Sequence, residues 1–285
     1  MKLCRFKHLH DGVHVGLFLD EETLLDLAPA GVGNLHSLLE DEDLPARLAE
    51  LAGRDLPRIF LGQVQLVAPV ERQEVWAAGV TYLRSKKARM EESDFSASAY
   101  DRVYEAERPE LFFKSPAEKV VATGGAVGIR KDARWNVPEP ELALVLNSRG
   151  KVVGYSIGND MSSRDIEGEN LLYLPQAKIY HRSCALGPCI EAGASEAEAR
   201  SWKIQIAIQR EGDTVFSGET SAGQIKRSFE ELAAFLFRSQ EFPNGAVLFT
   251  GTGIVPPDQF TLEENDLVRI SISGIGTLEN RVVRV

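Results

Sequence analysis

The chain has 285 residues, 44% of them hydrophobic, which suffices for one large core or for a main domain with a smaller companion. A formal net charge of -10 at pH 7 argues against nucleic-acid or membrane-surface partners, because both attract a basic face. The sequence contains no apolar run of the ~20 residues that a membrane helix needs and begins without the apolar segment of a secretory signal, so we expect a cytoplasmic protein. An anionic substrate would therefore need a locally positive site, which a bound divalent cation provides.

The first 70 residues predict a small N-terminal domain. Short strands are expected at residues 3–6 and 14–19, followed by an acidic helical segment at 35–51. Pro69 interrupts the extended run 66–70, which we interpret as a connector because proline lacks a backbone donor. We therefore predict a domain of residues 1–70 and a catalytic domain of residues 71–285.

The second part of the chain predicts a sheet-dominated domain, and the protein as a whole an α+β fold that is mainly β. β-rich runs separated by glycine and proline recur at 75–78, 120–121, 142–146, 152–157, 204–209, 247–249 and 267–272. Helices are expected at 82–93, which is rich in charge, and at 228–238, which begins with the capping box Ser-Phe-Glu-Glu. Neither a dinucleotide-binding turn, nor a phosphate-binding loop, nor a serine-hydrolase elbow occurs in the sequence.

The three cysteines, Cys4, Cys184 and Cys189, lack the two-residue separation of zinc and redox motifs. Reduced cysteine packs like a small apolar side chain. We therefore expect all three to be buried rather than to act as ligands.

A carboxylate cluster provides the main evidence for function. Glu139 and Glu141 are two residues apart at the start of an apolar strand, so they project to the same face and repel each other. Asp160 follows the next predicted strand and would meet them if the two strands pair. Three carboxylates with no neighbouring histidine or cysteine favour Mg²⁺, with Mn²⁺ as the alternative, over zinc.

Two further segments carry charge within apolar surroundings. Glu110 and Lys114 stand at the two ends of a short apolar run, a pattern that an ordinary edge strand also produces. Lys178 lies among prolines, aromatic residues and aliphatic residues, where burial would favour its neutral form and make it a plausible acid or base. The adjacent His181 is more typical of a structural histidine.

Four ordered motifs resemble the fumarylacetoacetate hydrolase superfamily from about Trp76 onward. They are the E-x-E of residues 139–141, the G-Y-x-x-x-N-D-x-S-x-R-D of residues 154–165, the segment around Lys178, and the T-G-T-G of residues 250–253. The resemblance implies a mixed β-sandwich roll that is usually dimeric, so we expect a homodimer or tetramer. It also implies that the three carboxylates hold magnesium and that Lys178, Arg164 and Thr252 lie near the substrate.

A closer resemblance is to the branch that dehydrates 2-keto-3-deoxy sugar acids, such as 2-keto-3-deoxy-D-arabinonate, which becomes 2,5-dioxopentanoate in pentose catabolism. It includes residues 79–82, 108–114, 138–142, 169–170, 172–176 and 178–180, and Glu167, where many hydrolase relatives have glutamine. Hydrolases of the superfamily carry a histidine and glutamate pair on a lid helix, and the aligned positions here hold Ser85 and Ala88.

These features together predict a metal-dependent hydro-lyase for a small anionic 2-oxo sugar acid. Metal chelation by the C1 carboxylate and C2 oxygen would acidify the C3 proton, and Lys178 or Glu110 would act as base, their order being open. Tyr82, Ser85, Lys114, Arg164, Glu167 and Thr252 complete the expected substrate-binding residues. The alternatives are a hydrolase that cleaves C–C bonds of acylpyruvates or 2,4-diketo sugar acids, and a non-catalytic sugar-acid sensor.

Overall fold

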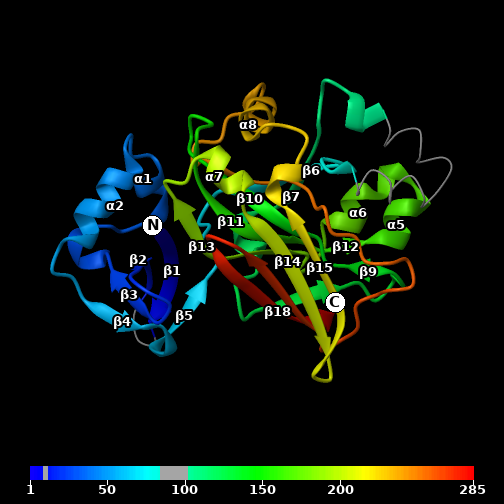
Figure 1. Ribbon diagram of the computed structural model, residues 1–285, viewed down its shortest axis with the longest axis horizontal. Coiled ribbons are helices and arrows are strands. Elements are labelled where there is room, and N and C mark those ends of the chain that lie inside the picture. The colour runs from blue at the N-terminus through cyan, green and yellow to red at the C-terminus, as the bar shows by residue number, and fades with distance from the viewer. Residues whose placement is uncertain (9–11, 84–101) are drawn as a thin grey trace.

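The computed structural model describes residues 1–8, 12–83 and 102–285 (Figure 1). The strands are β1 (Lys2–His8), β2 (Val13–Phe18), β3 (Thr23–Asp26), β4 (Arg58–Phe60), β5 (Val64–Val67), β6 (Glu74–Gly79), β7 (Glu110–Ser115), β8 (Ala126–Ile129), β9 (Asn136–Val137), β10 (Pro140–Leu146), β11 (Val152–Asp160), β12 (Ser162–Ser163), β13 (Cys184–Ala192), β14 (Lys203–Arg210), β15 (Asp213–Ser221), β16 (Ala246–Phe249), β17 (Leu267–Ile272) and β18 (Gly276–Arg284). The α-helices are α1 (Leu35–Leu39), α2 (Leu44–Ala52), α5 (Arg164–Glu169), α6 (Leu174–Lys178), α7 (Glu196–Arg200) and α8 (Phe229–Phe237). Short 3-10 helices are η1 (Ala28–Ala30), η2 (Leu61–Gln63), η3 (Ala117–Lys119), η4 (Leu171–Tyr173) and η5 (Ala222–Gln224).

Two large sheets form the body of the molecule within the described residues. The larger runs β4-β3-β2-β1-β13-β11-β10-β16-β6-β7, with β5 also paired to β1. The smaller runs β15-β14-β17-β18-β8, and β9 pairs with β12 in a separate two-stranded ladder. The pairs β16–β6 and β18–β8 are parallel and the other pairs antiparallel, so the sheets are mixed and the predicted mainly-β α+β class is confirmed.

The main core fills the space between the two sheets. Alternate residues of β10, Leu142, Leu144 and Leu146, join one buried cluster with the isoleucines of β14 and β17. The residues between them, Ala143 and Val145, belong to two other buried clusters. Because β10 is covered on both faces, its whole sequence is apolar after Glu141 instead of alternating with polar residues.

The N-terminal strands extend the larger sheet, and α1 and α2 cover them (Figure 1). β1 pairs with β13, and the apolar face of α2 shares a buried cluster with Val145 and Ile190 of the catalytic part. The predicted helix 35–51 is divided in two, because Asp43 caps a new helix whose first turn holds Pro45. The domain boundary near residue 70 stays a prediction.

Several other local predictions correspond to observed elements. Ser228 caps α8 by accepting the Glu231 amide, as the capping box predicts. The expected strand at 120–121 forms only a single bridge, between Val121 and Ala185. All three cysteines are buried. None of the helices in the described part of the chain has the length and apolar character that crossing a bilayer requires.

Candidate active site

The register of two central strands brings the three predicted carboxylates together. β10 and β11 are antiparallel, with Pro140 opposite Asn159. The amide of Asp160 donates to the carbonyl of Glu139 at 3.0 Å, so Asp160 lies directly across from Glu139. One carboxylate oxygen from each of Glu139, Glu141 and Asp160 lies within 4.8 Å of the others, and each residue is at most 3% exposed. The strand pairing on which the predicted meeting of Asp160 with the two glutamates depended is therefore present.

Three buried cations surround these carboxylates. Lys178 Nζ lies 2.5 Å from Glu139 Oε2, 3.2 Å from Asp160 Oδ2 and 2.6 Å from Ser162 Oγ. Arg164 Nη2 lies 3.1 Å from Glu139 Oε1, and Lys114 forms an ion pair with Asp160. The cations are at most 2% exposed, so the pairs are held in a desolvated environment where charges interact strongly. Three positive side chains thus accompany three negative ones.

Glu141 is the carboxylate that this arrangement compensates least. Among the described residues its hydrogen-bond donor is the backbone amide of Gly251, at 2.5 Å, and no cationic side chain pairs with it. Burial, followed by repulsion from Asp160 and Glu139, raises the pKa of Glu141 well above its usual range. A hard divalent cation with oxygen ligands would relieve this repulsion, so the donor set fits Mg²⁺ or Mn²⁺.

Replacing Glu141 with glutamine should therefore stabilise the metal-free protein. A carboxyl whose folded-state pKa is raised destabilises the fold once the pH exceeds its unfolded value of about 4.3, and the cost grows as the pH rises toward the folded value. We expect Glu141→Gln in EDTA to gain about 1–3 kcal/mol at neutral pH and nothing below about pH 4. Denaturant unfolding across this pH range measures the gain. The exposed Glu118→Gln is the control, and equal behaviour of the two variants would contradict the assignment.

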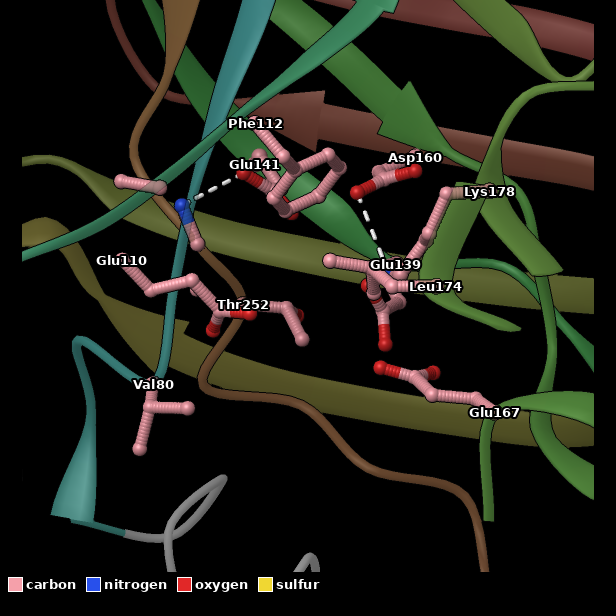
Figure 2. A pocket seen from close by; sticks show the side chains of 13 residues that line it. Val80, Glu110, Phe112, Glu139, Glu141, Asp160, Glu167, Leu174, Lys178 and Thr252 are labelled. Carbon is pink, nitrogen blue, oxygen red and sulfur yellow. Dashed lines mark hydrogen bonds and ion pairs between the residues drawn. The ribbon is translucent and has the colours of Figure 1, made fainter. Parts of the chain in front are cut away.

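A cavity opens over the carboxylates (Figure 2). Its lining residues are Ala78, Gly79, Val80, Glu110, Phe112, Glu139, Glu141, Asp160, Glu167, Leu174, Lys178, Gly251 and Thr252. Among the residues predicted to bind substrate, Glu167 and Thr252 line it together with the two predicted catalytic residues. The cavity thus combines acidic ligands, a lysine and an apolar wall, as expected of a site for a small polar molecule.

Strand β7 supplies one wall of the cavity. Alternation along the strand directs Glu110, Phe112 and Lys114 to the same face. Glu110 and Phe112 line the cavity, and Lys178 Nζ lies 5.8 Å from the centre of the Phe112 ring. Opposite Glu110 in the pairing of β6 and β7 is Gly79, where a Cβ atom would stand 2.0 Å from Glu110 Oε2. Glycine at this position therefore leaves the space that the Glu110 carboxylate occupies.

The Thr250–Gly253 segment supplies another part of the lining, with Thr252 beside Glu110 (Figure 2). Gly251 has a φ of 89°, and a Cβ atom there would lie 2.2 Å from Thr81 Oγ1. This conformation directs the Gly251 amide at Glu141, and Thr252 follows in the cavity lining. Tyr82 is 1% exposed, and its pKa is raised by burial and then by Glu141.

The remaining predicted residues lie in different places. Lys114 and Arg164 are buried behind the carboxylates instead of lining the cavity. His181 is exposed at the surface. Ser85, like Arg84 and Ala88, lies outside the described residues.

Sequence reasoning missed several residues of the site. Ser162 accepts a hydrogen bond from Lys178, and it belongs to the same motif as Asp160. Phe112 could have been found from strand alternation, since it stands midway between Glu110 and Lys114. Val80 could not have been identified from the sequence. Its φ of 53° is unusual for a β-branched residue and is set by tertiary structure.

This combination of mixed sheets and an E-x-E carboxylate site defines a known class of enzyme. The profile of the fumarylacetoacetate (FAA) hydrolase C-terminal family matches residues 74–283, and the chain belongs to this family. The predicted family fold is thereby confirmed.

The relatives include proteins named as sugar-acid dehydratases. The 2-dehydro-3-deoxy-D-arabinonate dehydratase of Saccharolobus solfataricus is 37% identical, over 98% of this chain and 95% of its own. A probable 2-keto-3-deoxyxylonate dehydratase of Haloferax volcanii is 47% identical over 76% of this chain and 74% of its own. A solved structure of 2-keto-3-deoxy-D-arabinonate dehydratase, complexed with magnesium and 2,5-dioxopentanoate, is 34% identical with a TM-score of 0.85 and covers 100% of this chain and 99% of that one.

Proposed function

We propose that this protein is a magnesium-dependent hydro-lyase that converts 2-keto-3-deoxy-D-arabinonate to 2,5-dioxopentanoate. The observation that carries the proposal is the cavity in which Lys178 and Glu110 face the buried Glu139, Glu141 and Asp160 cluster. The dehydratase relatives support the same reaction, and the relative solved with magnesium and 2,5-dioxopentanoate supports both the ion and the product.

The arabinonate and xylonate names of the two dehydratase relatives can describe one substrate. A 2-keto-3-deoxy pentonate has lost the stereocentres at C2 and C3 and keeps only C4. The arabinonate and xylonate derivatives are therefore the same compound whenever the parent sugar acids share the C4 configuration. We accordingly assign the substrate by chain length, the 2-oxo group and the C4 hydroxyl.

The charges of the cluster fit an anionic substrate. Glu139, Glu141 and Asp160 would hold the ion, and Mg²⁺ bound there supplies a Lewis acid that polarises the C2 carbonyl and acidifies the C3 proton. Lys114, Lys178 and Arg164 offset the carboxylates of the cluster, and the ion would add two positive charges at the point where the substrate carboxylate binds. This locally positive, desolvated centre would attract the C1 carboxylate of a 2-oxo acid.

The proton transfers fall to Lys178 and Glu110. One of them takes the C3 proton, and the other delivers a proton to the C4 hydroxyl, which leaves as water when the C4–O bond breaks. The resulting C3–C4 double bond carries a C5 hydroxymethyl group. Loss of protons from C5 and its hydroxyl, with return of protons to C3 and C4, gives the C5 aldehyde of 2,5-dioxopentanoate.

Glu167 and Thr252 are placed to contact the rest of the substrate. Both line the cavity beside the carboxylates, and Figure 2 shows Glu167 extending toward Glu139. A carboxylate and a hydroxyl can accept or share hydrogen bonds with the sugar hydroxyls. Tyr82 stands at the β6 end of the site, beside Gly253, and Ser85 completes the proposed substrate-binding set. Cytoplasmic location, assembly as a homodimer or tetramer and a place in pentose catabolism are expectations from the sequence and its resemblance.

Product analysis tests the proposed function. Incubation of the purified protein with Mg²⁺ and 2-keto-3-deoxy-D-arabinonate should yield a product lighter by one water, with an aldehyde at C5. Stripping the metal with EDTA should abolish turnover, and Mg²⁺ or Mn²⁺ should restore it. Carbon–carbon cleavage would favour the hydrolase instead, and an unchanged substrate that nevertheless binds would favour the sensor.

A further inference from the structure

Lys114 occupies an unusual position for a lysine. It is 0% exposed and stands on the inward face of β7, deeper than Glu110 and Phe112. Lysine is rarely buried completely unless its charge is paired. The cavity lining, as far as the described residues form it, does not include Lys114. A direct contact between Lys114 and substrate is therefore absent from this arrangement.

The ammonium group of Lys114 joins two separate segments of the site. It pairs with the Asp160 carboxylate and donates to the carbonyl of Met161 at 3.0 Å, at the end of β11. It also donates to the carbonyl of Lys178 at 2.5 Å, at the end of α6. The ammonium thus donates two hydrogen bonds and forms one ion pair, and each of its three partners belongs to, or adjoins, a residue of the proposed chemistry.

We propose that Lys114 is a positioning residue that fixes the metal ligand Asp160 and the catalytic Lys178 relative to each other. This inference rests on the proposed metal site and deepens it. The Asp160 oxygen that faces Lys114 is Oδ1, whereas Oδ2 faces Lys178, so Lys114 determines how the carboxylate is rotated. Residues that orient metal ligands in this way commonly contribute 10–100-fold to metal affinity.

A purely electrostatic role and a positioning role for Lys114 predict opposite changes in Mg²⁺ affinity when Lys114 is removed. A cation beside Asp160 repels an incoming divalent ion, so a purely electrostatic role means that loss of Lys114 strengthens Mg²⁺ binding. A positioning role means that loss of Lys114 weakens it, because Asp160 is no longer held. The sign of the change in Mg²⁺ affinity therefore separates the two roles.

Calorimetric titration of the metal-free, full-length protein with Mg²⁺ alone provides the test. We expect Lys114→Met to raise the Kd for Mg²⁺ by about 10–100-fold and to lower kcat even at saturating Mg²⁺, because Lys178 is also displaced. Lys114→Gln keeps an N–H donor on a side chain one atom shorter and should recover part of the affinity. Lys119→Met, an exposed lysine on η3, is the matched control.

Each result has a defined meaning. Tighter Mg²⁺ binding by Lys114→Met, or an unchanged Kd with only a lower Tm, would overturn the positioning role while leaving the metal site intact. Weaker binding with partial recovery in Lys114→Gln supports it. If Lys114→Met fails to fold, Lys114→Gln still decides, since a Kd equal to that of the wild type overturns the inference. Failure of the wild-type protein to bind Mg²⁺ would instead contradict the proposed metal site.

Discussion

Replacing Lys178 with methionine is expected to lower kcat by about 10²-fold or more, measured with saturating Mg²⁺ and 2-keto-3-deoxy-D-arabinonate. Methionine roughly preserves the length of the side chain and removes the amine that lies against Glu139, Asp160 and Ser162. The loss affects proton transfer, which general acid–base groups typically accelerate by 10²–10⁴-fold. KM should change less than kcat, because the ion and the other cavity residues still hold the substrate.

The control for this experiment is Lys119→Met, which changes an exposed lysine and should retain full activity. Circular dichroism and the Tm in Mg²⁺ should show that the Lys178 variant is folded. A normal kcat in Lys178→Met would make this lysine structural and transfer the role of base to Glu110. Glu110→Gln then becomes the variant that must lose activity.

The second large effect concerns reaction class. We expect kcat/KM for 2-keto-3-deoxy-D-arabinonate to exceed that for acetylpyruvate by about 10²-fold or more, with Mg²⁺ present in both assays. Hydrolysis of an acylpyruvate needs a water molecule activated by a positioned base. The positions aligned with the histidine and glutamate pair of hydrolase relatives hold Ser85 and Ala88, which cannot act as such a base. Dehydration requires only that a proton leave C3 and that the C4 hydroxyl depart.

A higher kcat/KM for acetylpyruvate than for 2-keto-3-deoxy-D-arabinonate would refute the dehydratase proposal and favour the hydrolase alternative. The double variant Ser85→His/Ala88→Glu provides a complementary test. If these positions select the reaction class, the variant gains measurable acetylpyruvate hydrolysis while its Mg²⁺ affinity stays unchanged. The comparison on the unmodified enzyme remains decisive, because a grafted pair also needs the correct geometry to activate water.

The sequence predicted the elements that local patterns determine. The apolar run after Glu141 and the Ser228 capping box correspond to β10 and α8, because burial and helix capping are encoded by neighbouring residues. The division between α1 and α2 was missed because helical periodicity continues across it, while Asp43 and Pro45 start a new helix. The sheet order, with β6 parallel to β16, involves partners that are far apart in the chain and has no local signature.

The composition of the site was predictable, but the partners of its charges were not. Spacing indicated that Glu139 and Glu141 share a face, and a polar strand end indicated Asp160. The burial of Lys114 against Asp160 brings β7 close to the end of β11, although β10, β16 and β6 separate the two strands in the larger sheet, and neither segment reveals this contact alone. Similarly, Gly251 was recognised as part of a motif, whereas its amide contact with Glu141 follows from a backbone conformation that only the folded loop specifies.

The balance between three buried cations and three buried carboxylates has a consequence for how the enzyme acquires its ion. A site made only of carboxylates would repel itself until it was filled, and folding would then depend on metal supply. Here three cations offset most of that repulsion, so the chain can reach its folded state first and take up Mg²⁺ afterward. The ion is then an exchangeable component whose occupancy follows the free Mg²⁺ concentration by mass action. A fall in free Mg²⁺ would silence the enzyme reversibly without unfolding it.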